Sequence, residues 1–392
     1  MTADQVVIVD GARTPVGRFG GAFKDVPAHE LGAHATVAAL DRAGVTGEDV
    51  QELVMGCIGQ IGSDAYNARR VALKAGLPVA TPAYTVNRLC GSGLQAIWSA
   101  AMEMRWSGLD LTVAGGDESM TRMPFYDFDA RSGYRLGDRK LVDGTVMMLT
   151  DPFHGVHMGV TAENVASRYG VSRREQDEFA AESQRRAASD AAQAAFAEEI
   201  VPVQAGGRKP FTVEVDEHPK PDTTVESLAA LRPAFDLAGT VTAGNASGIN
   251  DGAAAVVLAT QQAAARRGLK PLVALEAVTT GAIEPDLMGY APVLALTALF
   301  DKTGLRPADV DVIELNEAFA AQAVAVIRDA GLDPERVNPY GGAIALGHPV
   351  GATGAILSLR VARDLVRRDL ETGIVTMCIG GGQALAALFR RI

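Results

Sequence analysis

One segment of the chain is repeated at a fixed distance, and this repeat restricts the possible folds more than any other feature. Residues Ala39–Val50 resemble Leu299–Val310 without a gap, at an offset of 260 residues. The apolar runs that follow the two copies, Leu53–Gly56 and Ile313–Asn316, line up at the same offset. Duplication explains this unbroken match better than chance similarity between two unrelated α/β units. The chain is therefore predicted to contain two similar halves.

Short apolar runs alternate with helical patterns along both halves. In the first half, Val6–Val9, Leu53–Met55 and Leu111–Ala114 are predicted as buried strands because they are apolar, short and rich in Val, Leu and Ile. His29–Ala43 has the apolar spacing of a helix, and Gly44 is placed to end it. This alternation predicts an α/β architecture with helices packed on sheets.

The residues between the halves, 119–249, differ from both. Their first part is rich in Arg, Asp, Met and aromatic residues, and Ser172–Ala197 is predicted to be helical, with a capping box at Ser172–Glu175. Gly206–Pro210 is predicted to be a turn. The chain is thus divided into a first half of residues 1–118 and 250–269, an inserted loop domain of residues 119–249, and a second half of residues 270–392.

Composition excludes several classes of protein. The formal net charge is −11, which argues against nucleic acid as a main partner. The three cysteines, Cys57, Cys90 and Cys378, are too few for a disulfide framework and fit a reducing compartment. Neither a secretory leader pattern nor an apolar run of membrane-spanning length is present. We expect a soluble cytoplasmic protein without a membrane partner.

Cys90 stands at the expected start of a helix, Leu94–Met104. Gly91 and Gly93 allow a tight turn, and Ser92 is a candidate N-cap. Unpaired amides and the positive end of the helix dipole stabilise a thiolate at such a position. A nucleophilic thiol and a small buried thiol are both compatible with this pattern.

Two further segments supply candidate partners in the second half. His348 lies in the glycine-dense run Asn338–Gly354, where it is either a general base and hydrogen-bond donor or a loop residue with a structural hydrogen bond. Cys378 is predicted to follow the strand Gly373–Met377 directly. The glycines after it expose backbone amides that can bind an oxyanion, although a buried cysteine at a strand end is the alternative.

Asn316 is the fourth candidate, at the end of a predicted strand. Its amide can donate to an oxyanion directly or through water, whereas taken alone it is interpreted as an N-cap. Together, the four positions provide a nucleophile, a base, a second thiol and donors, all at strand ends or helix starts. A single site explains this better than four independent structural roles.

Other motifs carry less weight. Gly91–Ala96 matches the G-x-G-x-x-A pattern of dinucleotide binding, but the strand and turn spacing is wrong and a cysteine occupies the turn. His154 and His157 have the spacing of metal ligands on a helix, yet no set of carboxylates or cysteines accompanies them. Neither a nicotinamide nor a metal ion is expected.

From Val6 to Arg390 the chain resembles the thiolase family. Four stretches match the catalytic motifs of that family, in the family's order and spacing, and two shorter stretches match as well: Asn87–Gly93, Asn316–Ala320, Gly347–Gly354 and Cys378–Gly382, with Ser119–Thr121 and Asn245–Ala254. The resemblance implies the thiolase fold, in which duplicated α/β halves form a layered αβαβα core with an inserted loop domain.

The resemblance also implies a reaction, the reversible Claisen condensation of acyl-CoA thioesters by a ping-pong route through an acyl-cysteine. Cys90 would carry the acyl group, His348 would activate it, and Cys378 would take the α-proton of the second thioester. Asn316, through a water, and His348 would hold the enolate oxygen, and the amides of Cys90 and Gly380 the tetrahedral intermediate. Coenzyme A thioesters would be substrates, with no permanently bound cofactor.

The likeness is closest to short-chain members of the family, which form acetoacetyl-CoA from two acetyl-CoA. His157 and Met158 would then face the pantetheine arm, and Lys220 would lie near the CoA phosphates. The rest of the CoA tunnel would be lined by Phe235, Ala243, Ser247, Met288, Ala318 and Phe319. Gln383–Ala384 departs from the ending common in relatives. The segment Gly133–Leu149 resembles a loop that joins two dimers, which implies a homotetramer.

Three alternatives remain. A thiolase for longer or branched 3-oxoacyl-CoA shares every catalytic motif. A condensing enzyme that acts on a carrier protein shares the fold, but Cys378 argues against it. A non-catalytic, lipid-binding relative is disfavoured because Cys90, Asn316, His348 and Cys378 are all present.

Overall fold

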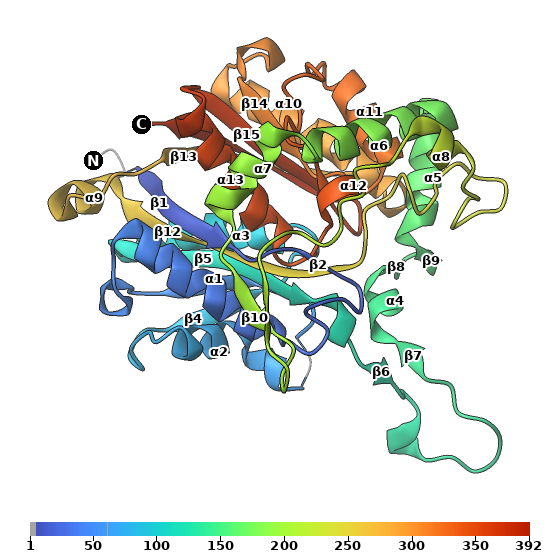
Figure 1. The fold of residues 1–392 in the computed structure, drawn as a ribbon, viewed down its shortest axis with the longest axis horizontal. Helices are drawn as coiled ribbons and strands as arrows, with labels where there is room; N and C mark the ends of the chain where they lie inside the picture. The colour runs from blue at the N-terminus through green and yellow to red at the C-terminus, as the bar shows by residue number, and fades with distance from the viewer. Residues whose placement is uncertain (1–4, 61) are drawn as a thin grey trace.

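A computed structural model describes residues 5–60 and 62–392 of the chain. Residues 1–4, which begin the N-terminal segment considered above for a leader, lie outside the described residues. The main sheet contains β1 (Val6–Arg13), β2 (Gly17–Arg18), β3 (Leu53–Gly56), β4 (Ala83–Val86), β5 (Leu111–Ser119), β12 (Asn250–Thr260), β13 (Val273–Ala282), β14 (Val312–Leu315), β15 (Thr372–Ile379) and β16 (Gln383–Arg391). Its order is β14-β15-β16-β13-β1-β12-β5-β3-β4, with β2 beside β12 (Figure 1).

The sheet consists of two half-sheets that meet at one narrow contact. β1 and β13 pair at only two positions, Val7 with Ala274 and Ile8 with Val273. On one side, β3 runs parallel to both β4 and β5; on the other, β14 runs parallel to β15. The strands that the repeat predicted, β3 and β14, thus take corresponding places in the two half-sheets.

Helices cover both outer faces and fill the space between the half-sheets (Figure 1). They are α1 (Ala28–Ala43), α2 (Asn67–Lys74), α3 (Ser92–Ser107), α9 (Gln261–Arg267), α10 (Ala291–Thr303), α11 (Ala320–Asp329), α12 (Ala343–Leu346) and α13 (Thr353–Arg367). α1 and α2 pack on the first half-sheet, α10 and α11 on the second, and α3 and α13 lie between the two. The result is the layered αβαβα core that was predicted.

Strand β1 illustrates how the sequence produces these layers. Val6 and Ile8 belong to the central core with α3 and α13, whereas Val7 and Val9 belong to the outer core with α1. Successive side chains of a strand point to opposite faces, so a strand covered on both faces is apolar throughout. The continuous apolar run at Val6–Val9 therefore fits a strand between two helical layers.

The two central helices cross where each has a glycine as its second residue. A Cβ on Gly93 would lie 2.7 Å from the backbone nitrogen of Ala355, and a Cβ on Gly354 would lie 2.3 Å from that of Leu94. Real Cβ atoms do not approach backbone this closely, so both positions require glycine. The contact brings together the N-terminal ends of α3 and α13, one from each half of the chain.

The inserted segment forms an arm and a helical cover. Its elements are β6 (Phe125–Tyr126), β7 (Val142–Asp143), α4 (Gly144–Met148), β8 (Thr150–Asp151), β9 (Val156–His157), α5 (Met158–Tyr169), α6 (Arg173–Ala187), α7 (Asp190–Glu199), β10 (Val203–Ala205), β11 (Phe211–Val213) and α8 (Val225–Ala229). The hairpin of β6 and β7 extends away from the body, while α5 and α6 lie beside the second half (Figure 1). The division into three domains stays a prediction.

The helix predicted over Ser172–Ala197 is in fact two helices. Ser172 and Glu175 form the expected capping box at the start of α6. The chain then breaks at Ser189, whose hydroxyl accepts a hydrogen bond from the amide of Ala192 and begins α7. Helical periodicity continues across the break, so it does not reveal a second N-cap within the run. The turn expected at Gly206–Pro210 joins β10 to β11.

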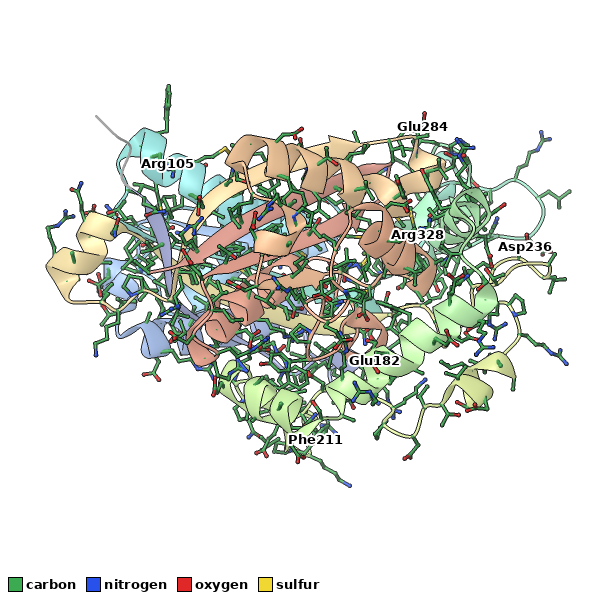
Figure 2. All side chains as sticks on the ribbon, turned by 90° about the horizontal axis from the view of Figure 1, so that it is seen from above. Arg105, Glu182, Phe211, Asp236, Glu284 and Arg328 are labelled. Atoms are coloured by element: carbon green, nitrogen blue, oxygen red, sulfur yellow. The ribbon has the colours of Figure 1, made fainter. Side chains whose placement is uncertain are left out.

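Helix α7 ties the insertion to both halves through buried charges. The carboxylate of Glu199 accepts hydrogen bonds from Arg13 of β1 (2.7 Å) and Arg360 of α13 (3.2 Å). Seen from above, side chains fill the space between the sheet and its helices, whereas exposed residues such as Arg105, Asp236 and Glu284 lie along the rim (Figure 2). Within the described part of the chain, no helix is long and apolar enough to cross a membrane.

Candidate active site

A cavity of about 330 Å³ opens where the two halves and the inserted segment meet. It is lined by nearly all of the residues that the sequence singled out. From the catalytic set these are Cys90, His348, Cys378 and Gly380, and from the CoA-binding set His157, Met158, Phe235, Ala243, Ser247, Met288, Ala318 and Phe319. Residues distant in sequence, from both halves, therefore share one site. Asn316 and Lys220 are not among the lining residues, but Asn316 contacts His348, which is.

Cys90 is held in a tight turn between β4 and α3. Ser92 is the first residue of the helix rather than its N-cap, which corrects the prediction. Its hydroxyl donates to the carbonyl of Leu89 (2.6 Å) and accepts from the amide of Arg88 (2.9 Å), so it bridges the turn. Leu89 has a left-handed backbone (φ +47°), an unusual conformation for a residue with a side chain. The turn thus presents Cys90 to the cavity.

Backbone amides point at the thiol of Cys90, but burial dominates its acidity. The amide N–H groups of Gly380 and of Cys90 itself act to lower the pKa of this thiol. Burial has the larger effect and raises the pKa to about 11. The amides thus act in the predicted direction, but burial outweighs them in the ligand-free protein. A base must remove the proton before the sulfur attacks.

The loop that carries His348 is fixed by side chains on either side. The backbone N–H of His348 donates to Asn250 Oδ1 (2.9 Å), and the neighbouring Gly347 (φ +96°) has no room for a Cβ against Asn250. His348 Nδ1 lies 2.7 Å from the hydroxyl oxygen of Thr353, which donates its own proton to the carbonyl of Pro349. The position of the imidazole is thus set by several contacts.

These contacts also determine where the imidazole proton sits. With the hydroxyl proton of Thr353 donated to Pro349, the hydroxyl oxygen accepts the proton of His348 Nδ1, and the donor Asn316 Nδ2 beside Nε2 favours the same tautomer. Nε2 is then unprotonated and available as a base. Burial lowers the pKa of His348 to about 4, so the ring is neutral near pH 7.

Asn316 lies next to His348, beyond the end of β14. Helix α11 begins only at Ala320, with Phe319 at the N-cap, so the N-cap interpretation of Asn316 is wrong. Its Nδ2 lies 3.4 Å from His348 Nε2, and its Oδ1 is buried with no protein partner in the described structure. The amide is thus free to bind a further group beside the imidazole.

Cys378 lies inside β15 and pairs with Ala384 of β16, whereas the sequence placed it after the strand. Gly381 and Gly382, both with φ of +81°, form the turn between these strands. Burial, reinforced by the neighbouring Cys90, raises the pKa of the Cys378 thiol far above its usual range. Both thiols are therefore protonated in the ligand-free protein.

The cavity is narrow beside the two thiols. A Cβ on Gly380 would lie 3.2 Å from Leu89 Cδ1 and 3.5 Å from Met158 Cε, so these two apolar side chains flank the glycine. Met158 is the first residue of α5, and its neighbour His157 is the N-cap. The start of α5 thus places an apolar side chain in the cavity wall beside Gly380.

Aromatic rings form another wall. His157 stacks on Phe235 with ring centres 4.7 Å apart, and Phe235 meets Phe319 edge to face at 6.1 Å. His157 Nδ1 accepts the amide N–H of Gly159 (3.1 Å), and burial lowers the pKa of the ring. A neutral, stacked histidine suits the uncharged middle of a long ligand.

The segment around Ser247 joins the insertion to the second half. The amide of Ser247 donates to the carbonyl of Ala318 (3.0 Å), and the amide of Ala320 donates to the carbonyl of Asn245 (2.9 Å). Lys220, in contrast, is exposed, and only its backbone is held, by Gln184. The role of Lys220 near CoA phosphates stays a prediction.

Several lining residues were not found from the sequence. Most are apolar, and although some lie inside the motifs, none was singled out as a site residue: Ile58, Leu89, Met120, Met148, Leu149, Ala234, Ala246, Gly248, Ile249 and Val350. The matching stretch Ser119–Thr121 contains Met120, and the richness in Met of the first part of the insertion pointed toward Met148. Apolar side chains line a pocket through the fold, so local patterns do not identify them.

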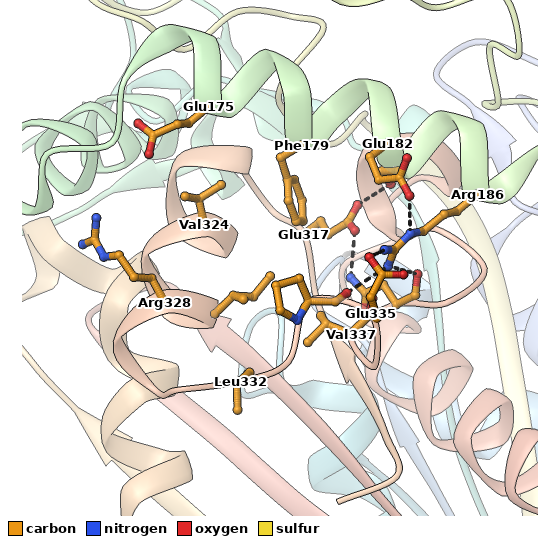
Figure 3. A pocket seen from close by; sticks show the side chains of 14 residues that line it. Glu175, Phe179, Glu182, Arg186, Glu317, Val324, Arg328, Leu332, Glu335 and Val337 are labelled. Carbon is orange, nitrogen blue, oxygen red and sulfur yellow. Dashed lines mark hydrogen bonds and ion pairs between the residues drawn. The ribbon is translucent and has the colours of Figure 1, made fainter. Parts of the chain in front are cut away.

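A second cavity, of about 540 Å³, lies between α6 and α11 (Figure 3). Its charged groups are already paired: Arg186 binds Glu182 (2.7 Å) and the carbonyl of Val337 (2.7 Å). In its floor, Glu317 accepts hydrogen bonds from Ser183 and Asn338. None of the predicted site residues lines this cavity, but its floor supports the segment that carries Asn316.

Metal binding finds no support in the described residues. No group of three or more His, Cys, Asp or Glu side chains among residues 5–60 and 62–392 is arranged to hold a metal ion. His154 instead places its Nδ1 2.8 Å from the carboxylate of Asp151.

The chain has a duplicated, five-layered α/β fold, which brings two thiols and an imidazole to the junction of its halves. This is the architecture of an acyl-transferring condensing enzyme. The chain belongs to the thiolase family: the models described as thiolase N-terminal domain and thiolase C-terminal domain match residues 6–262 and 269–391. The family and the fold predicted from the sequence are thereby confirmed.

Curated relatives and solved structures agree over the full chain. The chain is 50% identical to beta-ketothiolase BktB of Cupriavidus necator, covering 99% of each chain, and 47% identical to acetyl-CoA acetyltransferase of Escherichia coli, covering 98% and 99%. Acetyl-CoA acetyltransferase of Bacillus anthracis superposes with a TM-score of 0.97. The match is 40% identical in sequence and covers 100% of this chain and 99% of the other. Human mitochondrial 3-ketoacyl-CoA thiolase in complex with CoA superposes with a TM-score of 0.96 (40% identity, 100% and 98% covered).

Proposed function

We propose that this enzyme condenses two molecules of acetyl-CoA into acetoacetyl-CoA and CoA, and catalyses thiolysis in the reverse direction. The observation that carries the proposal is the meeting of Cys90, His348 and Cys378 in one cavity, with the amides of Cys90 and Gly380 aimed at the Cys90 sulfur. The names of the bacterial relatives support the acetyl-CoA substrate.

The first half-reaction transfers an acetyl group to Cys90. His348 Nε2 takes the thiol proton, and the sulfur attacks the thioester carbon. The amides of Cys90 and Gly380 hold the developing oxyanion. The bond to the CoA sulfur then breaks, and the leaving thiolate takes the proton of Cys378. The products are acetyl-Cys90, free CoA, protonated His348 and a Cys378 thiolate.

The second half-reaction forms the carbon–carbon bond. The Cys378 thiolate takes an α-proton from the second acetyl-CoA. Because burial raises the pKa of Cys378 far above its usual range, this thiolate is a strong base. Protonated His348 and Asn316, the latter through a water, hold the enolate oxygen. The enolate attacks acetyl-Cys90, and the leaving Cys90 sulfur regains its proton from His348, so every proton is accounted for.

Covalent capture is tested by mass spectrometry. After incubation with acetyl-CoA, a digest should contain an acetyl group on the Cys90 peptide, and the Cys57 peptide from the same digest serves as the unmodified control. Cys90→Ser should remove both the adduct and the activity. If no adduct forms on Cys90 while acetoacetyl-CoA is produced, the covalent route is wrong.

A preference for short acyl chains is also part of the proposal. Met158 and Leu89 crowd Gly380 beside the thiols, which leaves little room for a longer acyl chain. The alternative is a thiolase of broader or longer specificity, which the names of the Cupriavidus and human relatives favour. Comparing kcat/KM for thiolysis of acetoacetyl-CoA and 3-oxooctanoyl-CoA decides between them, because equal values would refute the short-chain assignment.

We further propose a homotetramer in the cytoplasm. The arm carries exposed apolar side chains, including Phe125, Phe128 and the almost fully exposed Leu136 (98%), and β4 is a free edge of the sheet near Trp106 (92% exposed). Exposed apolar surface of this kind supports contacts between copies. All three cysteines are free, which supports a reducing compartment. Light scattering after gel filtration should give the molar mass of four subunits for the full chain, and a smaller mass if the arm is deleted.

A further inference from the structure

Glu118 is a buried acid that neither the motifs nor the proposed mechanism uses. It lies near the end of β5, and its side chain is completely inaccessible to solvent. Its two carboxylate oxygens accept the backbone N–H groups of Ile58 (3.0 Å) and Gly59 (2.9 Å). The backbone N–H of Gly351 also faces this carboxylate and acts to lower its pKa, and a Cβ on Gly351 would lie 2.7 Å from Glu118 Oε2. Three backbone donors thus converge on one side chain.

The three donors come from the two halves of the chain. Ile58 follows β3 of the first half and lines the cavity. Gly351 belongs to the loop of the second half that contains His348 and Val350, both of which also line the cavity. One carboxylate therefore joins the turn on one side of the active site to the loop that carries the imidazole on the other.

The packing around Gly351 leaves no room for another side chain that could replace Glu118 in joining the two segments. A Cβ on Gly351 would lie 2.7 Å from the carbonyl oxygen of Asp117, 2.7 Å from Glu118 Oε2 and 3.0 Å from the carbonyl oxygen of Gly56. The loop rests directly on the ends of β3 and β5, so no side chain of its own can anchor it there. The N–H groups in this region require an acceptor, and Glu118 provides it.

We propose that Glu118 is a positioning residue of the condensation, which clamps the His348 loop to the turn at Ile58 so that His348 keeps its place beside Asn316 in the cavity that it shares with Cys90. The inference rests on the proposed thiolase reaction. Glu118 touches no substrate, and it acts through the backbone of the two segments that it joins. A displacement of about 1 Å at reacting groups lowers a rate by about 100-fold.

The charge of Glu118 provides a readout that a purely structural role would not affect. The carboxylate acts to raise the pKa of the Cys90 thiol, so removal of its charge lowers that pKa. The other ionisable groups facing Glu118 are Asp117 on its own strand, Asp251 on β12 and Cys57 after β3. These stay in place when Glu118 alone is changed.

The test compares Glu118→Gln with two other variants. Glu118→Gln replaces an acceptor oxygen by a donor that faces N–H groups, so kcat should fall about 10- to 100-fold while KM for acetoacetyl-CoA stays within threefold. Alkylation of Cys90 by iodoacetamide should reach its half-maximal rate at a lower pH than in the wild type. Glu118→Asp keeps the charge but shortens the clamp, so kcat should fall without a change in the alkylation profile.

Asp311→Asn is the matched control. Asp311 also accepts two backbone N–H groups, those of Glu371 and Thr372, but lies away from the cavity. The Asp311→Asn variant should have a lower melting temperature than the wild type, with an unchanged kcat and an unchanged alkylation profile of Cys90. The proposal is overturned if Glu118→Gln keeps the wild-type kcat and profile, or if Asp311→Asn loses as much activity. Because alkylation needs no acyl-CoA, its profile tests Glu118 even if the thiolase reaction itself proves wrong.

Discussion

Replacement of Thr353 by valine isolates the hydrogen bond that fixes the proton on His348 Nδ1. Valine has the same shape as threonine but cannot accept that proton at the 2.7 Å contact. A buried donor left without a partner costs about 1–3 kcal/mol. The imidazole can avoid this cost by moving its proton to Nε2, which removes the base from the cavity. The active form then becomes less favourable by the same free energy.

A free-energy cost of about 1–3 kcal/mol corresponds to a rate about 5- to 150-fold lower. We therefore expect kcat for thiolysis of acetoacetyl-CoA to fall by this factor in Thr353→Val, with KM within threefold of the wild type. Thr353→Ser keeps the hydroxyl and should retain most of the activity. The assay follows acetoacetyl-CoA consumption at saturating CoA, and circular dichroism confirms that each variant is folded.

Two results would refute this reasoning. If Thr353→Val keeps kcat within twofold of the wild type, the hydroxyl does not set the tautomer of His348. If Thr353→Ser is impaired as much as Thr353→Val, the methyl group matters through packing, and the proton arrangement is not the cause.

Three other predictions address acidity, the second thiol and the central contact. Because burial raises the pKa of Cys90 to about 11, its alkylation by iodoacetamide without substrate should still accelerate above pH 9, and a plateau near pH 7 would contradict this. Cys378→Ala should still form acetyl-Cys90 but make no acetoacetyl-CoA, and product at the wild-type rate would exclude Cys378 as the base. Gly354→Ala places a methyl group 2.3 Å from the backbone nitrogen of Leu94. The free energy of unfolding, measured by urea denaturation, should therefore fall by about 1–3 kcal/mol. An unchanged urea midpoint would mean that the two helices can move apart at no cost.

The sequence was sufficient for the architecture because the decisive patterns are local. The repeat at Ala39–Val50 and Leu299–Val310 predicted two halves, and the apolar runs predicted strands covered on both faces. The glycine-rich motifs around Cys90 and His348 identified residues that the fold brings into one cavity. Each of these patterns depends on the residues of its own segments, so it can be recognised before it is known how the segments pack together.

The failures concern properties that depend on distant segments. Ser92 and Asn316 look like N-caps because their residue types favour that role, but Ser92 is already the first residue of α3, and α11 begins four residues after Asn316. The net acidity of Cys90 could not be predicted, because the helix start is visible in the sequence whereas the burial that outweighs it comes from packing against other segments. Ile58 and Val350 were missed because each becomes a cavity wall only when the halves meet.

The crossing of α3 and α13 at Gly93 and Gly354 has a consequence for how such an enzyme can change. The distance between the nucleophile of one half and the imidazole of the other is set there by backbone against backbone, which no rotamer change can relax. Met158 and Phe235, which we propose to shape the acyl pocket, belong to the inserted segment and take no part in that crossing. These two walls can therefore be remodelled for another thioester while the crossing keeps the two halves in place.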